Sequence, residues 1–220
     1  MADEQIQTGA DSGPPKDCPY CPRLVALRLS LRGKHPDWFN APVPSFGDPH
    51  ARLAIVGLAP GLNGANRTGR PFTGDYAGDL LYRTLIDLGL ASGEYEARPD
   101  DGLVLNGCLI TNAVRCLPPA NKPTPEEINT CRPFLSGQIE ALPAVRAILA
   151  LGRVAHESVV RAHGGRLKDF PFAHGAVHDL PGGIRLFDSY HCSRYNTNTR
   201  RLTEAMFISV MTEARDWARR

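Results

Sequence analysis

The sequence predicts an α/β domain with a mostly parallel central sheet. Short apolar segments alternate with segments of helical spacing, which is the order that strand–helix–strand units produce. The predicted strands end in glycine or polar residues and continue into long loops. Functional side chains of parallel sheets lie at the carboxyl ends of the strands, so these loops are where a site is expected.

The chain is expected to form one domain over residues 17–220. Residues 1–16 are polar and acidic and are predicted to be a disordered leader. They are not expected to be a secretory signal, because they lack its basic and apolar regions. Three leucines at helical spacing predict a short helix over 22–32. Four prolines in residues 33–50 predict a long loop.

Four strands and four further helices are predicted after this loop. The strands cover residues 52–57, 103–114 (with Gly107 as an interruption), 145–151 and 184–189. The helices run from Gly78 to Leu90, from Thr124 to before Pro143, over 152–163 and over 202–217. The second of these helices begins with a capping-box pattern, Thr124-Pro-Glu-Glu127. The alternation predicts helices on both faces of the sheet.

Composition excludes several classes of protein. Hydrophobic residues make up 42% of the 220 residues and charged residues 22%, which excludes a largely disordered chain. The net charge of +2 is lower than that of proteins that coat DNA by bulk charge, so any contact with nucleic acid must be local. No apolar run approaches the roughly 20 residues that span a bilayer. The sequence therefore predicts a soluble cytoplasmic protein.

Four of the six cysteines form two pairs. Cys18 and Cys21 have C-x2-C spacing, whereas 14 residues separate Cys116 from Cys131. Thiols stay reduced inside cells, which favours metal or redox chemistry over disulfides. Four thiolates suit either zinc or an iron–sulfur cluster. The wide second pair is unlike a zinc ribbon, but spacing does not decide the metal. The two other cysteines, expected to be small buried hydrophobic residues, are Cys108 and Cys192.

Two loops are rich in small and polar residues. Residues 57–75 contain glycines that let the backbone approach a ligand, although neither the dinucleotide motif nor the P-loop motif is present. Residues 190–201 combine arginines, tyrosines and short polar side chains, which suit phosphate and groove contacts. The alternatives are an elaborate surface loop for the first and a solvated loop before a helix cap at Thr203 and Glu204 for the second.

With the four cysteines, three segments make the chain resemble the uracil-DNA glycosylase superfamily, most closely its family 5 (type b) iron–sulfur members. These segments are GLAPGLNGANRTGRPFTGD at 57–75, TNAVRC at 111–116 and YHCSRYNTNTRRLT at 190–203. The resemblance extends from about Cys18 to the end of the chain. It implies a three-layer α/β/α sandwich with a central four-stranded parallel sheet. It also implies that Cys18, Cys21, Cys116 and Cys131 hold a [4Fe–4S] cluster, and this resemblance is the reason for preferring iron to zinc.

The implied activity is that of a monofunctional DNA glycosylase in base-excision repair. Such an enzyme flips a deaminated base out of DNA and hydrolyses its N-glycosidic bond, leaving an abasic site. The expected bases are uracil and also hypoxanthine and xanthine. No lysine matches a catalytic position, so the strand is expected to stay uncut. DNA containing such bases is the expected partner of a monomer.

The resemblance also assigns roles to residues of the site. Phe72 matches the aromatic residue on which the base stacks, and Asn112 matches the residue that reads the base edge. His191 matches the histidine that stabilises the anionic leaving base. Ala59, two residues after Gly57, replaces the acid that other branches carry, and Asp75 matches the substitute that activates water. Asp79 is a weaker alternative, expected to be a charge in the first turn of a helix.

Several residues of the two loops are expected to contact DNA. The loop from Ser193 to Arg201 matches the family's DNA-intercalation loop, and arginines suit phosphate contacts. The expected DNA contacts are Asn63, Arg67, Arg70, Arg194, Tyr195, Asn196 and Arg200.

Three other functions fit the sequence less well. A family 4 glycosylase normally carries an acid where this chain has Ala59. Binders that do not catalyse, or that trap uracil-DNA covalently, carry a distinctive basic insert near the first motif, and GANRTGRPF has no histidine-bearing run of that kind. A zinc nucleobase deaminase needs H-x-E before P-C-x-x-C, which this chain lacks.

Overall fold

The computed structural model describes residues 13–220, which fold around a six-stranded sheet in the order β1-β5-β2-β6-β8-β7. Its four central strands pair in parallel. They are β5 (Cys108–Asn112), β2 (Leu53–Gly57), β6 (Ala147–Leu151) and β8 (Arg185–Ser189). This confirms the predicted α/β class and the four parallel strands.

The two edge strands were not predicted, so the expected four-stranded sheet is corrected to six strands. β1 (Phe46–Gly47) pairs antiparallel with β5, and β7 (Val177–Asp179) pairs antiparallel with β8. Strands of two and three residues are too short to show a hydrophobic period in the sequence. β1 also lies within residues 33–50, which were predicted to be a loop because they contain four prolines.

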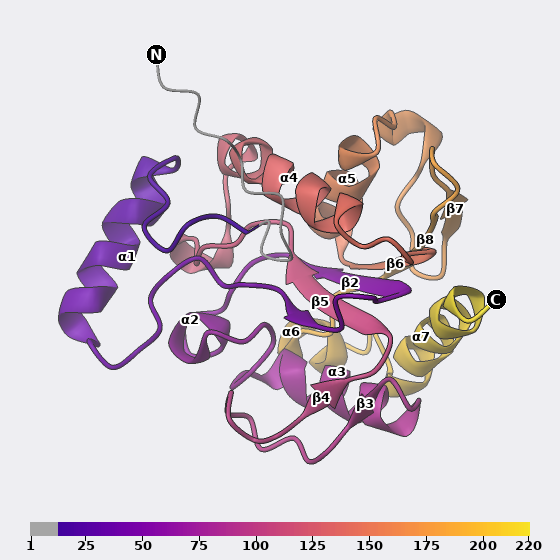
Figure 1. The fold of residues 1–220 in the computed structure, drawn as a ribbon, viewed down its shortest axis with the longest axis horizontal. Coiled ribbons are helices and arrows are strands. Elements are labelled where there is room, and N and C mark those ends of the chain that lie inside the picture. The colour runs from indigo at the N-terminus through magenta and orange to yellow at the C-terminus, as the bar shows by residue number, and fades with distance from the viewer. Residues whose placement is uncertain (1–12) are drawn as a thin grey trace.

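Helices cover both faces of the sheet, which confirms the three layers (Figure 1). α3 (Tyr76–Asp87) and α7 (Glu204–Ala218) lie on one face, and α4 (Pro125–Glu140) and α5 (Arg153–Ala162) lie on the other. Two separate apolar cores result, one on each side of the sheet.

Alternate residues of β2 enter these two cores. Leu53 and Ile55 pack in the core beneath α3 and α7, whereas Ala54 and Val56 pack in the core beneath α4 and α5. All four side chains are essentially inaccessible to solvent. Successive side chains of a strand point to opposite faces of the sheet, and here both faces are covered by apolar cores. A parallel strand of this kind is therefore apolar at every position.

Side-chain caps fix the starts of three helices. Asp75 caps α3 by accepting a hydrogen bond from the Gly78 N–H. Thr124 and Glu127 form the predicted capping box at the start of α4. Thr203 caps α7 through the Met206 N–H. These bonds satisfy backbone donors that have no partner inside a helix.

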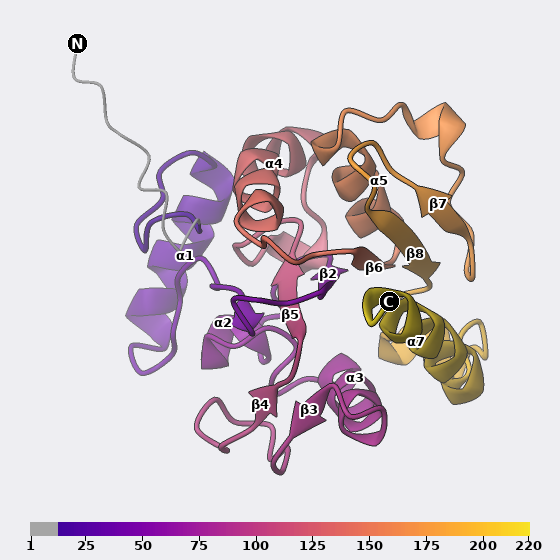
Figure 2. The same ribbon diagram turned by 45° about the vertical axis from the view of Figure 1, so that its right-hand side comes forward.

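The remaining elements are short or lie beside the sheet. The predicted strand over 103–114 is two strands, because Gly107 (φ 64°) turns the chain between them. Helix α1 lies next to α4, where Arg23 pairs with Glu127 and Leu24 packs against Cys131 (Figure 2). The elements not yet given are α1 (Pro22–Lys34), α2 (Ala65–Thr68), β3 (Ala91–Ser92), β4 (Val104–Leu105), the 3-10 turns η1 (Pro119–Asn121) and η2 (Leu167–Asp169), and α6 (Arg194–Asn198).

The predicted disordered leader lies largely outside the described residues. Its last four residues, 13–16, are described, and two of them hold the start of the domain. The Pro15 carbonyl accepts a hydrogen bond from Cys18 N–H, and the Lys16 carbonyl accepts one from Arg32. Among residues 13–220, no helix is long and apolar enough to cross a membrane.

Candidate active site

A cavity of about 740 Å³ opens at the carboxyl ends of the parallel strands. Its walls come from the loops after β2, β5, β6 and β8, which is the position expected for a site in this fold. Four residues whose roles the resemblance implies line it, namely Phe72, Asp75, Asn112 and His191. Ala59 also lines it, so the position where other branches carry an acid faces the cavity.

Asn112 is the last residue of β5 and brings a polar group to the cavity wall. It is buried, and its side-chain Oδ1 has no hydrogen-bond partner within the described part of the chain. A buried polar atom without a partner costs free energy of about 1–3 kcal/mol. The position of Asn112 on the cavity wall makes a ligand the natural partner for this oxygen.

The Phe72 ring lies beside Asn112 because Gly57 leaves room for it. A Cβ at Gly57 would lie 2.6 Å from the Phe72 ring and closer still to Asn112 Oδ1, so no larger residue fits. Phe72 has φ 54°, a left-handed conformation that costs on the order of 1–3 kcal/mol in a residue with a side chain. Its ring is stacked with that of His191, with centroids 5.8 Å apart and an angle of 25° between the planes.

His191 follows β8 and lines the same cavity as Asn112. Burial lowers the pKa of His191 to about 4, so its ring is neutral at neutral pH. A neutral imidazole carries one N–H and can donate one hydrogen bond to a ligand. The backbone carbonyl of His191 accepts a hydrogen bond of 2.8 Å from the Asn196 side chain, which ties the residue to α6.

Asp75 is a half-buried carboxylate at the start of α3. Its Oδ1 accepts a hydrogen bond of 3.1 Å from Gly78 N–H, while Gly61 and Gly64 lie against Oδ2. Burial raises the pKa of Asp75, and the hydrogen bonds from Gly78 and Ala77 partly oppose this rise. The carboxylate is thus held in one position by a helix N-terminus and by glycines that lack side chains.

The predicted DNA contacts lie in different surroundings. Arg194 and Tyr195 are exposed, with 72% of the Tyr195 side chain accessible, and Arg194 lies 5.2 Å over the Tyr76 ring at the cavity rim. Asn63 and Arg67 are exposed near the start of α2, where Arg67 donates to the Asn63 carbonyl. Of the three others, Asn196 holds His191 as described, Arg200 is exposed after α6, and Arg70 is buried.

Arg70 has a different role from the one that the sequence predicted. Its guanidinium is buried and forms two hydrogen bonds of 2.7 Å with the carboxylate of Asp101. Its Nε donates to Thr73. A guanidinium enclosed in this way cannot reach a phosphate, so we remove Arg70 from the DNA contacts.

Several residues of the cavity wall were missed by sequence analysis. Asn121 (φ 55°) reaches the wall from the proline-rich turn η1, and Phe172 reaches it from the segment between η2 and β7. Arg201 lies 4.5 Å over the Tyr190 ring and also lines the wall. No motif marks Asn121 or Phe172, since only the fold brings their segments to the cavity, whereas Arg201 ends the predicted DNA-intercalation loop.

The four paired cysteines gather at one place between α1, the end of β5 and α4. Cys18 and Cys131 are buried, Cys21 and Cys116 are half-buried, and all four line one small cavity. Arg28 lies beside this group, with Nη1 3.8 Å from Cys116 Sγ and Nη2 donating to the Cys18 carbonyl. The other two cysteines, Cys108 and Cys192, are buried in the core as predicted.

The spacing of these sulfurs tests which metal group fits. In residues 13–220, three ligand atoms within 4.8 Å of one another occur at His156, His178 and Asp188, and no three cysteine sulfurs come as close. Two sulfurs on one zinc ion are at most about 4.6 Å apart, because a Zn–S bond is about 2.3 Å long. As placed, the thiols are therefore farther apart than the ligands of a single zinc ion.

Comparison with known proteins shows the family to which the chain belongs. Residues 44–215 match the model of the uracil DNA glycosylase superfamily. The type-5 uracil-DNA glycosylase of Thermus thermophilus is 50% identical over 90% of this chain and 92% of the relative, and that of Pyrobaculum aerophilum is 40% identical over 90% and 88%. The type-4 uracil-DNA glycosylase of Sulfurisphaera tokodaii is 32% identical over 76% and 72%. The chain belongs to the uracil-DNA glycosylase superfamily, within its type-5 branch.

Proposed function

We propose that this chain removes uracil from DNA by hydrolysing the N-glycosidic bond. Membership of the family makes it an enzyme, a hydrolase of N-glycosyl bonds. The observation that carries the proposal is one cavity lined by an aromatic face, an amide, a neutral imidazole and a carboxylate. These four groups meet the needs of binding a base, stabilising it as a leaving group and activating water.

The cavity binds the base after it has been flipped out of the duplex. Flipping costs a few kcal/mol of stacking and pairing, which a stacking surface partly restores. The Phe72 ring supplies that surface. Asn112 Oδ1 then accepts a hydrogen bond from uracil N3–H, while its amide N–H donates to O4. This pairing gives the buried oxygen of Asn112 the partner that it lacks.

Breaking the bond leaves an electron pair on the base and positive charge on the sugar. His191, neutral because its pKa is lowered to about 4, donates a hydrogen bond to O2 of the departing base. The neutral imidazole keeps its N–H proton and stabilises the anionic base by donating a hydrogen bond.

Asp75 acts on the other side of the bond. Its carboxylate stabilises the positive sugar and orients a water molecule toward C1′. As the C1′–N bond breaks and the C1′–O bond forms, the water proton passes to Asp75 and from there to solvent. The helix N-terminus and Gly64 hold the carboxylate in place for this role. Asp79 is exposed in the first turn of α3 and does not line the cavity, which favours Asp75.

The substrate range extends to larger deaminated bases. Ala59 leaves space where other branches carry a carboxylate, so hypoxanthine and xanthine enter the same cavity. No lysine lines the cavity in the described chain, so the product is an abasic site in an uncut strand, as base-excision repair requires. We expect a monomer acting on DNA in the cytoplasm, gripping it through exposed Arg194, Tyr195 and Arg200.

The cysteine group holds a [4Fe–4S] cluster in this proposal. Cys18, Cys21, Cys116 and Cys131 are its ligands, and the cluster supplies cross-links rather than a reacting group. It joins α1 to the segments that follow β5, whose last residue is Asn112. The cluster thereby supports the wall of the active cavity without touching the substrate.

The two rival functions are less well supported. Ala59 in the cavity wall disfavours the type-4 reaction geometry, and the type-5 relatives are the more similar ones. A protein that only binds uracil in DNA has no use for a half-buried carboxylate whose ionisation burial makes unfavourable.

An assay on duplex DNA tests the proposal. Labelled duplexes with a single uracil, hypoxanthine or xanthine are incubated with the enzyme, and half of each sample is then treated with alkali. We expect strand breaks in the alkali-treated half alone. Breaks without alkali would disprove a monofunctional reaction, and band shifts without any abasic product would favour the binder.

A further inference from the structure

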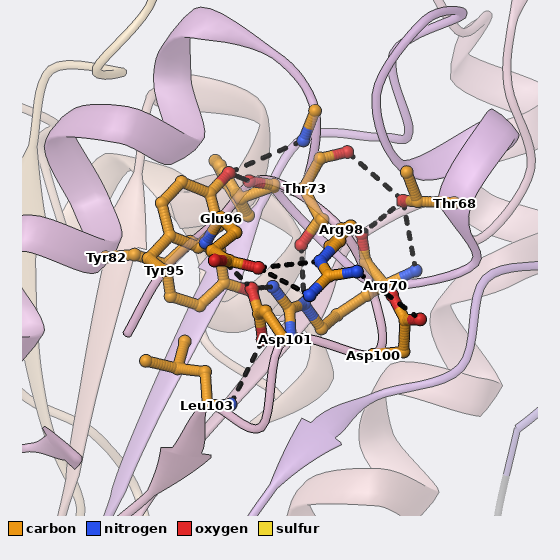
Figure 3. Close-up of polar contacts among 12 residues, drawn as sticks. Thr68, Arg70, Thr73, Tyr82, Tyr95, Glu96, Arg98, Asp100, Asp101 and Leu103 are labelled. Carbon is orange, nitrogen blue, oxygen red and sulfur yellow. Dashed lines mark hydrogen bonds and ion pairs between the residues drawn. The ribbon is translucent and has the colours of Figure 1, made fainter. Parts of the chain in front are cut away.

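The buried ion pair of Arg70 and Asp101 lies directly beneath the turn that carries Phe72. Only about 5% of the Arg70 side chain and none of the Asp101 side chain is accessible to solvent. The two guanidinium NH groups meet the two carboxylate oxygens at 2.7 Å each, and Asp101 also accepts hydrogen bonds from the Leu103 and Glu96 N–H groups. The Arg70 hydrogen bonds are the main cause that lowers the pKa of Asp101 to about 2. The pair is thus fully ionised and fully bonded (Figure 3).

Aromatic rings enclose the guanidinium on several sides. The Arg70 Cζ atom lies 5.1 Å from the Phe46 ring centroid, 5.3 Å from that of Tyr82 and 5.8 Å from that of Tyr95. Such cation–π contacts are strongest where water is excluded. The charge therefore fixes the positions of both tyrosines as well as that of Asp101.

The same tyrosines hold the backbone of the Phe72 turn. Tyr82 Oη donates a hydrogen bond of 2.6 Å to the Pro71 carbonyl, and Tyr95 Oη donates one of 3.2 Å to the Phe72 carbonyl. Arg70 Nε donates to Thr73 Oγ1 at 2.7 Å. Tyr95 Oη also lies 3.4 Å from Gly74 N–H, the residue before Asp75. Every residue from 71 to 74 is therefore bonded to this group.

These bonds explain how Phe72 keeps an unfavourable conformation. A residue with a side chain keeps a positive φ only where surrounding contacts hold its backbone in place. For Phe72 these contacts come from Arg70, Asp101, Tyr82 and Tyr95. Without them, the turn is free to relax, and the Phe72 ring leaves the position between Gly57 and His191. The stacking surface for the base would then be lost.

We propose that Arg70 and Asp101 are positioning residues for base excision, which act by holding the Phe72 ring. The inference rests on the proposed function, and it assigns a role in the reaction to the loop between β3 and β4, which supplies Tyr95 and Asp101. The pair touches no substrate and acts through Phe72. The proposal predicts that a change to the Arg70–Asp101 pair slows excision only when Phe72 is present.

A double-mutant cycle on single-turnover uracil excision tests this prediction. The variants are Asp101→Asn, Phe72→Ala and the two combined, with Asp179→Asn as the control that loses an exposed ion pair to Arg185. We expect Asp101→Asn to slow excision by about tenfold or more, and the double variant to be no slower than Phe72→Ala. Affinity for duplex DNA should change less than about threefold, since phosphate contacts stay intact. Full multiplication of the two single effects, or a wild-type rate for Asp101→Asn, would overturn the proposal.

A milder variant keeps the test valid if Asp101→Asn fails to fold. Tyr95→Phe removes one hydroxyl, the donor to the Phe72 carbonyl, and leaves the Arg70–Asp101 pair and the ring in place. It should slow excision less than Asp101→Asn does, and again only in the presence of Phe72. An effect of equal size in the Phe72→Ala background would contradict the proposal.

A measurement on the ring itself separates this proposal from the proposed function. The enzyme is labelled with fluorophenylalanine, and the Phe72 signal is assigned in the ¹⁹F NMR spectrum by its loss in Phe72→Leu. Asp101→Asn and Tyr95→Phe should shift or broaden this signal, whereas Asp179→Asn should not. The result does not depend on activity, so an unmoved Phe72 signal refutes the positioning role. Absence of uracil release by the wild type refutes only the proposed function.

Discussion

The carboxylate of Asp75 lies against the backbone of Gly64. A Cβ at position 64 would come within 2.9 Å of Asp75 Cγ and closer still to Oδ2. Gly64 has φ −94°, so no positive φ calls for glycine here, and the close approach to Asp75 is one reason that this position needs it. The Asp75 carboxylate can thus hold this position only because residue 64 has no side chain.

Gly64→Ala should therefore inactivate the enzyme without unfolding it. The methyl group displaces the Asp75 carboxylate, and a displacement of about 1 Å can cost on the order of 100-fold in rate. Gly61→Ala should have a smaller effect, because its Cβ would lie 3.2 Å from Oδ2. Gly33→Ala is the matched control, since its Cβ meets nothing within 4 Å. Equal single-turnover rates for all three variants would contradict the assignment of Asp75.

The pH dependence of excision should follow the ionisation of Asp75. Water activation needs the carboxylate, so activity is lost as the pH falls through the Asp75 pKa, which burial raises above its usual 3.8. His191 should add no transition near pH 6.5, because its pKa is lowered to about 4. The measurement is the single-turnover rate from about pH 3 to about pH 8, a range that includes the transitions of both groups. A rate that rises as His191 becomes protonated would contradict this account.

The ionised Asp75 carboxylate, which activity needs, should lower the stability of the fold because the group is buried. Because the folded-state pKa of Asp75 is raised, its ionisation destabilises the fold once the pH exceeds that pKa. Asp75→Asn removes the charge and keeps a good N-cap, so Tm should rise at pH 7, by about 2–4 °C for each kcal/mol relieved. Asp75→Ala also removes the bond to Gly78 N–H and should gain less or lose stability. Thermal melts of both variants at pH 7 and pH 4 check this; a Tm of Asp75→Asn below that of Asp75→Ala would be the contrary result.

Loss of a paired cysteine should remove iron, and loss of a core cysteine should not. Cys131→Ser takes away one of four ligands, which we expect to abolish the broad absorbance near about 400 nm that such clusters give. Tm should fall as well, because α1 is no longer cross-linked to the segments around β5 and α4. Cys108→Ala is the control, as this thiol is buried in the main core and contacts none of the four. Iron content per chain and a thermal melt give the answer; iron retained in Cys131→Ser, or zinc in the purified wild type, would contradict the cluster.

Arg194→Gln should weaken binding to duplex DNA about uniformly across sequences. The side chain is exposed at the cavity rim, and loss of one phosphate contact lowers the slope of log affinity against log salt by about 1. Arg166→Gln serves as a control of similar exposure, because Arg166 pairs with Asp169 and does not line the cavity. Fluorescence anisotropy at several salt concentrations measures both slopes. Identical slopes for wild type and Arg194→Gln would remove Arg194 from the interface.

The fold could be predicted where residues carry a long local pattern. The strand over 53–57 and the helix starting after Thr124 were predicted from period, capping residues and flanking glycine or proline. β1 and β7 were missed because two or three residues carry no period, and pairing with a neighbouring strand forms them. Such edges depend on tertiary contacts that no local segment encodes.

The site could be predicted where a motif carries the chemistry. Phe72, Asp75, Asn112 and His191 were assigned through motifs, and the fold brings all four to one cavity. Arg70 was misassigned, because an arginine in a glycine-rich loop looks the same in sequence whether it faces DNA or a buried aspartate. Its partner Asp101 is 31 residues away, in a loop that has no motif.

The central claim is that Asp75 activates the water that displaces the base. The direct measurement is the single-turnover rate of uracil release by wild type and Asp75→Asn, with affinity for uracil-containing duplex measured in parallel. We expect the rate to fall by about 100-fold or more, as loss of a general base does, while DNA affinity stays within about threefold. An Asp75→Asn rate equal to that of the wild type would contradict the account.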